Sequence, residues 1–144
     1  MPSMSPPVSF KRARLLLLCA PVLTLAACGS TASSGNFKGE EHEVAQTVAN
    51  LQSDAMANEY KKICSDDLAD PVVLRLGGQS ACEHAIKEQV AEIENFETTV
   101  ESVKVDPAAK TATATVKSIY GGKSALVTVS LVKEDGKWKI ASLR

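Results

Sequence analysis

Aromatic residues are scarce in this chain, and the sequence motifs of common enzyme classes are missing. The chain has one tryptophan, two tyrosines, three phenylalanines and two histidines among 144 residues. With so few aromatic rings, we expect the hydrophobic core to need all of them. The sequence has no Ser-His-Asp order, no glycine-rich phosphate loop, no His-Glu-x-x-His and no paired Cys-x-x-Cys. The sequence therefore does not indicate any of the enzyme classes that these four motifs mark.

A hydrophobic run long enough to cross a membrane is also missing. The apolar stretch from Leu15 to Leu25 is shorter than the roughly 20 apolar residues that a membrane-spanning helix needs. Basic residues precede this stretch between positions 11 and 14, and the small pair Ala26-Ala27 follows it. This order predicts a signal peptide over residues 1–27 that is removed from the mature protein.

The stretch Leu25-Ala26-Ala27-Cys28 resembles the lipobox of bacterial lipoproteins. The resemblance implies that Cys28 carries a diacylglyceryl group and becomes the N-terminus of a protein anchored in the cell membrane, on the extracytoplasmic side. At about 0.8 kcal/mol per buried CH₂ group, two acyl chains hold a small domain on a membrane. The alternative is an ordinary secretory signal with a chance cysteine near the cleavage site.

An excess of basic residues is absent from the mature chain. The signal peptide holds three of the 16 basic residues and none of the 17 acidic ones, so 13 remain against 17, a net charge of −4. This balance argues against nucleic acid as a partner. Residues 28–39 are rich in Gly, Ser, Thr and Ala, which predicts a flexible tether, and residues 40–144 suffice for one domain.

Two cysteines, Cys64 and Cys82, are left once Cys19 leaves with the signal peptide and Cys28 is lipidated. An oxidising compartment favours a disulfide between them, which stabilises a domain by about 3 kcal/mol in the chain-entropy model. The alternative is a metal site that combines both cysteines with His84. Structural zinc takes four ligands, and no fourth Cys or His lies nearby in the sequence. We therefore expect a disulfide, and neither a metal ion nor another cofactor.

Helical periodicity dominates the first half of the mature domain. Apolar residues recur every three or four positions from Glu40 to Ile63, which predicts one long amphipathic helix. The segment Asp66 to Leu76 predicts one or two short helical turns, closed by Gly77-Gly78. A third helix is expected from Ala81 to about Asn95, with Ser80-Ala81-Cys82-Glu83 as its capping box.

Alternating apolar and polar residues replace this periodicity after Asn95. They predict four strands joined by short turns, at Phe96–Val105, Thr111–Tyr120, Ser124–Lys133 and Lys137–Leu143. Alternation is clearest from Ala112 to Tyr120, where every second residue shares one face. Helices followed by an antiparallel meander predict an α+β domain.

The order of these elements, with the ending Asp135-Gly136-Lys137-Trp138-Lys139-Ile140, resembles the nuclear transport factor 2-like superfamily, to which ketosteroid isomerases and polyketide cyclases belong. The resemblance covers about Glu40 to Arg144. It implies N-terminal helices packed on a curved four-stranded antiparallel sheet, in the shape of a cone. It also implies an apolar cavity at the wide end of the cone, where ligands and active sites are found in that superfamily.

The residues that can line such a cavity are four aromatic residues and two residues of the second predicted strand: Tyr60, Phe96, Val116, Ser118, Tyr120 and Trp138. The hydroxyl groups of Ser118 and Tyr120 are the expected polar contacts with a ligand.

An acid–base pair is not evident in this predicted cavity. Isomerase-type enzymes place an acidic base among apolar side chains, whereas the Ala112–Tyr120 face has no carboxylate and no imidazole. Asp54 and Glu59 are the nearest acidic candidates, and we expect both on the solvated face of the first helix. We expect His42 to lie on the surface and His84 to have a structural role.

The sequence therefore predicts a non-catalytic module, attached to the membrane through Cys28, that binds a small apolar ligand or a protein of the cell envelope. A cavity enzyme of the ketosteroid isomerase or polyketide cyclase type is the alternative. A homodimer through the face of the sheet is compatible with the predicted fold.

Overall fold

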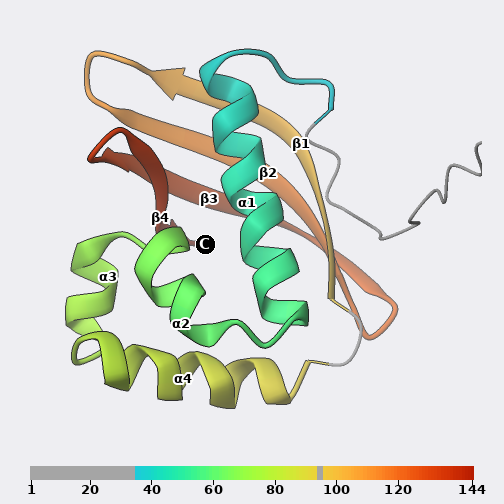
Figure 1. The fold of residues 1–144 in the computed structure, drawn as a ribbon. Coiled ribbons are helices and arrows are strands. Elements are labelled where there is room, and N and C mark those ends of the chain that lie inside the picture. The colour runs from blue at the N-terminus through green and yellow to red at the C-terminus, as the bar shows by residue number, and fades with distance from the viewer. Residues whose placement is uncertain (1–34, 94–95) are drawn as a thin grey trace, which may run out of the picture.

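The computed structural model describes residues 35–93 and 96–144. Helices come first along the chain: α1 (Glu40–Met56), α2 (Tyr60–Lys62), the π-helix η1 (Ile63–Asp67), α3 (Asp70–Arg75) and α4 (Gln79–Ala91). Four strands follow: β1 (Phe96–Asp106), β2 (Thr111–Tyr120), β3 (Lys123–Glu134) and β4 (Lys137–Leu143). The predicted α+β class is confirmed (Figure 1).

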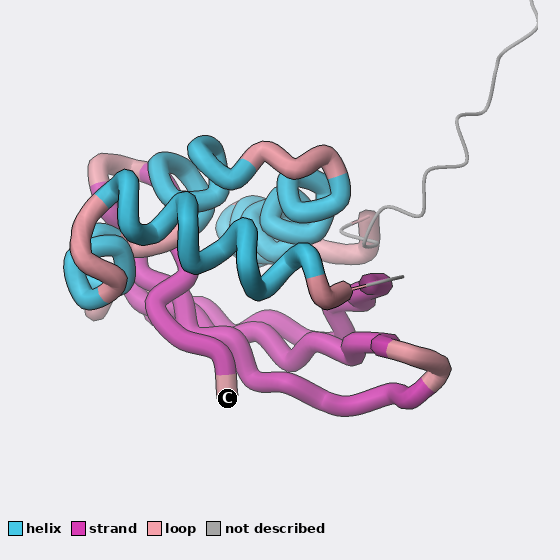
Figure 2. Tube along the Cα trace, turned by 90° about the horizontal axis from the view of Figure 1, so that it is seen from below, coloured by secondary structure: helices cyan, strands magenta, loops and turns pink. Residues whose placement is uncertain are grey.

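The strands form one antiparallel meander in the order β1-β2-β3-β4. Figure 2 shows the helices on one side of this sheet. The sheet is curved, and its register shifts between Val100 and Ser102 on β1 and between Ser130 and Leu131 on β3. Such β-bulges bend a strand and increase its twist. The two bulges therefore help the sheet to curve around α1.

Helix α1 buries one face against the concave side of the sheet. The alternation predicted for β2 is confirmed in its first half, where Ala112, Ala114 and Val116 are buried, while Tyr120 is 52% exposed. Polar contacts also tie the layers together, since Gln52 Oε1 accepts hydrogen bonds from the backbone N–H and the hydroxyl of Thr98 on β1.

The long helix predicted to reach Ile63 ends instead at Met56. Asn58 follows with φ at 60°, a left-handed conformation that asparagine tolerates better than most residues. Its N–H donates to the carbonyl of Ala55, and the N–H of Glu59 donates to the carbonyl of Asp54. This pair of hydrogen bonds is a Schellman motif, which satisfies the last carbonyls and stops the helix. The prediction was wrong because the apolar spacing continues across the break.

The segment between α1 and α4 is tied to the edge of the sheet. Leu68 forms a parallel bridge with Ile140, and the N–H of Ala69 donates to the Ile140 carbonyl. The predicted closure at Gly77-Gly78 is confirmed, with φ at 98° and 91°. The short helical turns predicted between Asp66 and Leu76 are confirmed, although Asp66 itself lies within η1, which begins at Ile63, and the next helix begins at Asp70.

Helix α4 begins at Gln79, and its N-cap is Gly78 without a side-chain hydrogen bond, so the capping box predicted at Ser80 is not formed. It ends at Ala91, earlier than expected, and Asn95 lies outside the described residues. No helix in the described part of the chain is long and apolar enough to span a membrane.

Candidate functional site

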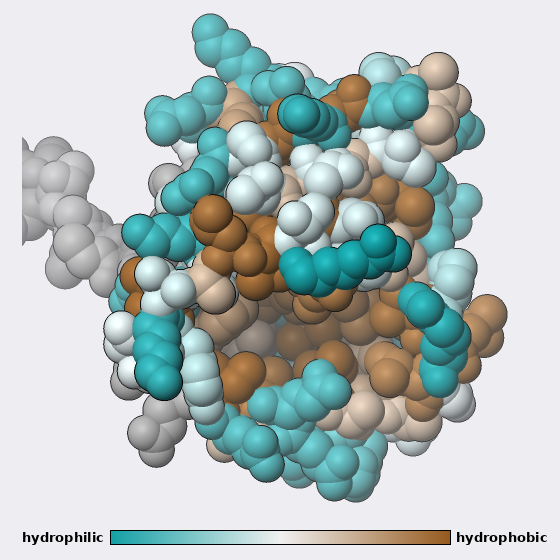
Figure 3. Space-filling model, turned by 180° about the vertical axis from the view of Figure 1, so that it is seen from behind, coloured by the Kyte–Doolittle hydropathy of each residue, from teal (hydrophilic) through white to brown (hydrophobic). Residues whose placement is uncertain are grey.

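An apolar pocket of about 270 Å³ lies between α1 and the concave side of the sheet. Nearly all of its surface is contributed by apolar atoms of residues from α1 and all four strands: Val48, Leu51, Phe96, Thr98, Val116, Ser118, Val127, Val129, Ile140 and Leu143. Figure 3 shows a hollow with hydrophobic walls on the face opposite to that of Figure 1. Such a lining fits a small apolar ligand.

The structure brings three of the six predicted pocket residues together. Phe96, Val116 and Ser118 line the apolar pocket. Tyr60 and Tyr120 do not line it; the hydroxyl of Tyr60 donates to Asn58, and that of Tyr120 donates to the Glu92 carbonyl at 3.1 Å. Tyr120 lies outside the apolar pocket because it is at the exposed end of β2.

The polar atoms of the pocket are used within the protein. The hydroxyl of Ser118 donates to the Ala125 carbonyl at 3.4 Å, and that of Thr98 donates to Gln52. A ligand in this pocket would therefore be held mainly by apolar contact.

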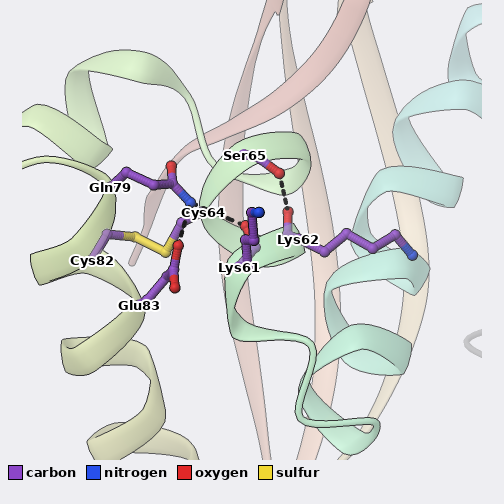
Figure 4. The surroundings of a disulfide bond; sticks show 7 residues. All are labelled: Lys61, Lys62, Cys64, Ser65, Gln79, Cys82 and Glu83. Atoms are coloured by element: carbon purple, nitrogen blue, oxygen red, sulfur yellow. Dashed lines mark hydrogen bonds between the residues drawn. A yellow bond between two sulfur atoms is a disulfide. The ribbon is translucent and has the colours of Figure 1, made fainter.

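The predicted disulfide between Cys64 and Cys82 is confirmed. It joins η1 to the first turn of α4, as Figure 4 shows. Nearby, the side chain of Gln79 on α4 donates to the Lys61 carbonyl at 3.2 Å, which ties α4 to α2, and to Glu83 of its own helix at 2.9 Å. Both sulfur atoms are consumed by this bond, so they offer no thiolate to the zinc alternative.

The two histidines lie on the surface, as expected for His42. His84 pairs with Glu88 on α4 at 3.6 Å, and both side chains are exposed. Among the described residues, no group of three or more His, Cys, Asp or Glu is arranged to hold a metal ion.

A pair of buried carboxyl groups, Asp54 on α1 and Asp67 on η1, was not predicted. Their exposed fractions are 5% and 3%, so the expectation that Asp54 is solvated is wrong, whereas Glu59 is exposed as predicted. The ammonium group of Lys62 lies 2.8 Å from Asp54 Oδ1 and compensates one negative charge. Burial raises the pKa of Asp67 to about 7, and the nearby charge of Asp54 adds to this rise. Near neutral pH Asp67 therefore changes between its neutral and its charged form.

A second, polar cleft of about 450 Å³ opens beside this carboxyl pair. Its walls come from α1, from α2 and η1, from the turn between β3 and β4, and from the start of β4: His42, Glu43, Gln46, Thr47, Asn50, Lys62, Asp66, Asp67, Gly136, Lys137 and Trp138. The sixth predicted pocket residue, Trp138, thus lies in this cleft and not in the apolar pocket. The two sites share no lining residue.

One member of the buried carboxyl pair could have been predicted from the sequence, and the other could not. Asp54 is three positions after Leu51 and one before Ala55, so helical spacing places it beside the buried face of α1, and this signal was available. Asp67 carried no such signal, because its neighbour Asp66 is exposed and only the π-helix turns Asp67 inward.

Comparison with known proteins leaves the family open. No family model matches the chain, and no curated protein matches it. Among solved structures, a de novo designed protein with a curved β-sheet is similar over 46% of this chain, at 19% identity and a TM-score of 0.38. The chain spans 62% of the length of that designed protein.

Proposed function

We propose that this protein is a lipid-anchored module on the extracytoplasmic side of the cell membrane, and that it binds a small apolar ligand without catalysing a reaction. The apolar pocket between α1 and the sheet carries this proposal. The lipobox-like stretch ending at Cys28 supports the anchor. The disulfide fits an oxidising compartment outside the cytoplasm.

The fold that we propose for this function is the cone of the nuclear transport factor 2-like superfamily. The order of helices and strands, the curvature of the sheet and the position of the pocket between α1 and the concave side support it. Binding to an envelope protein is the second form of the same proposal, and a homodimer could use the outer face of the sheet, where Leu126 is 66% exposed.

A cavity enzyme of the ketosteroid isomerase type needs an acidic base among the apolar side chains that hold its substrate. The described residues that line the apolar pocket include no acidic side chain and no imidazole. The buried carboxyl groups of Asp54 and Asp67 lie elsewhere, and Asp67 lines the polar cleft. We therefore favour binding over catalysis.

Filling the apolar pocket tests the proposal. The full-length protein is titrated with 1-aminoanthracene, a small neutral dye whose fluorescence rises in apolar surroundings. We expect saturable binding of one dye per chain, abolished by Val116→Trp, because Val116 is buried and lines the pocket. Leu143→Trp, at an exposed lining position, should weaken binding without crowding the core.

Thr113→Trp is the matched control, since Thr113 lies on the exposed face of the same strand as Val116. This variant and Tyr120→Phe should both bind the dye like the wild type. Equal binding by the wild type and by folded Leu143→Trp and Val116→Trp would exclude the pocket as the binding site.

A further inference from the structure

Three buried polar atoms have no hydrogen-bond partner in the described structure. Two of them, Trp138 Nε1 and Asp67 Oδ2, belong to side chains that line the polar cleft; the third is Asp54 Oδ2, on the carboxyl group that Asp67 hydrogen-bonds when it is protonated. The exposed fractions of Trp138 and Asp67 are 4% and 3%. An unpaired polar atom at a buried position costs about 1 to 3 kcal/mol. Native proteins leave few such atoms, so two of them beside one cleft call for an explanation.

The two atoms need opposite kinds of hydrogen-bond partner. The indole N–H of Trp138 can only donate, and the Asp67 carboxylate, which is the prevailing form above its pKa of about 7, can only accept. A ligand that satisfies both must present an acceptor and a donor close together. A hydroxyl group does both, and a molecule with several hydroxyls can meet the two atoms at once.

The charges around the cleft exclude a strong preference for an ion. Positive and negative charges are interspersed on the walls, which carry two lysines and three acidic residues: Lys62, Lys137, Glu43, Asp66 and Asp67. A cleft that selects an anion or a cation gathers charge of one sign. Exposed Asn50 adds a neutral amide on the α1 wall, where it accepts a hydrogen bond from Gln46.

We propose that this cleft is a second binding site, and that it takes a neutral polyhydroxylated ligand, a saccharide of one or two rings. One hydroxyl of the saccharide accepts from Trp138 Nε1, and another donates to Asp67. The volume of about 450 Å³ lies within the range of small-molecule sites. The site does not depend on the apolar pocket, with which it shares no residue.

The lone tryptophan of the chain makes a site-specific reporter, because Trp138 gives the only indole N–H signal in a ¹H–¹⁵N correlation spectrum. The ¹⁵N-labelled full-length protein, in a detergent without a sugar headgroup, is titrated with cellobiose, with N,N′-diacetylchitobiose and with inorganic phosphate. We expect the indole signal to move saturably with at least one disaccharide, with a dissociation constant of about 1 mM or lower, and not with phosphate.

Two variants test the contacts. At pH 8, where Asp67 is mostly ionised, Asp67→Asn should weaken saccharide binding about tenfold, because it removes a charge-assisted hydrogen bond. Glu59→Gln is the matched control and should change the affinity by less than about threefold, since Glu59 is exposed and does not line the cleft. Trp138→Phe, followed by calorimetry, should weaken binding as well, because phenylalanine keeps the ring but lacks the donor.

An indole signal that neither disaccharide moves at tens of millimolar would overturn the proposal. So would a response to phosphate alone, or a saccharide affinity that is the same in Asp67→Asn, Glu59→Gln and the wild type. The dispersion of the amide signals reports whether each variant is folded, and any one folded variant suffices for the comparison. Dye binding in the apolar pocket is measured separately, so the two proposals fail independently.

Discussion

Asp67 is an ionisable residue in surroundings that favour its neutral form. Burial raises its pKa to about 7, and Asp54 on the adjacent helix adds to the rise. The ordinary pKa of an aspartate in an unfolded chain is about 3.9. Between these values the native protein binds more protons than the unfolded chain. This residue therefore makes the free energy of unfolding fall as the pH rises from about 4 to about 7, with no further loss above.

Replacing Asp67 by asparagine should remove this pH dependence. The amide stays neutral and can donate to Asp54, as the protonated carboxyl group does. We expect Asp67→Asn to have a free energy of unfolding about 1 to 2 kcal/mol above that of the wild type at pH 8, with a smaller gain at pH 5. Urea denaturation at both pH values measures the difference.

Asp66→Asn is the control for this measurement, because Asp66 is the exposed neighbour on η1. It should keep the pH dependence of the wild type. If Asp67→Asn also kept it, the group that titrates near neutral pH would be another one.

At the scale of the element, the end of α1 depends on one backbone conformation. Asn58 has φ at 60°, where a β-branched side chain is strained. Asn58→Val should lower the free energy of unfolding by about 1 to 2 kcal/mol, whereas Asn58→Gly should leave it unchanged or raise it slightly. Thermal or urea unfolding checks both values.

Asn50→Val is the matched control for the end of α1, since Asn50 lies within the helix and is exposed. Its cost should be about 0.5 kcal/mol or less, because valine and asparagine have similar helix propensities. Equal losses in Asn50→Val and Asn58→Val would mean that the left-handed residue is not what ends the helix.

The disulfide bond between η1 and α4 stabilises the helical layer. Cys64 and Cys82 are both buried, and α4 contacts the rest of the molecule mainly through α2, η1 and α3. Cys64→Ala or Cys82→Ala should lower the free energy of unfolding by about 2 to 4 kcal/mol. Urea denaturation with and without reductant measures it.

The double variant, in which both cysteines are replaced by alanine, is the control. Reductant should destabilise the wild type and leave the stability of the double variant unchanged. Thiol titration of the folded single variants should find one free thiol in the described domain. Two free thiols in the folded wild type, or zinc bound in stoichiometric amount, would contradict the disulfide.

At the scale of the whole molecule, the proposed function requires attachment to a membrane through Cys28, which lies outside the described residues. Cys28→Ser should abolish metabolic labelling by a fatty acid and leave an uncleaved precursor or a soluble protein. Cys19→Ser, within the predicted signal peptide, is the matched control and should be labelled like the wild type. Labelling that persists in Cys28→Ser would exclude the proposed anchor.

Much of the fold could be predicted because it follows from local patterns. Period-two alternation marked all four strands to within one residue at each end, and the turns Gly121-Gly122 and Asp135-Gly136 adopt the positive φ values that tight hairpins need. Bounds of the helices were less accurate. Apolar spacing continues past Met56 although the helix stops there. Ser80 is a residue type that commonly caps helices, but the N-cap of α4 is Gly78.

The residues of the candidate sites could likewise be predicted only where a local strand pattern places them. Phe96, Val116 and Ser118 meet because the strand face that alternation predicts is also the face that curves over α1. Tyr120 lies on that strand but beyond the packed region, and Trp138 approaches α1 from β4 at the other site. Residue type alone could not separate these positions, since their distance from the core depends on the bend of the sheet.

The sequence by itself determined the α+β order of the domain and the pairing of Cys64 with Cys82, because periodicity and cysteine count are properties of neighbouring or scarce residues. Only the tertiary structure decided which polar groups are buried. Asp54, Asp67 and Trp138 belong to three elements whose approach depends on the helix end at Met56, on the π-helix and on the curvature of the sheet. The free energy of a buried charge depends on all its neighbours at once, and those neighbours are far apart in the sequence.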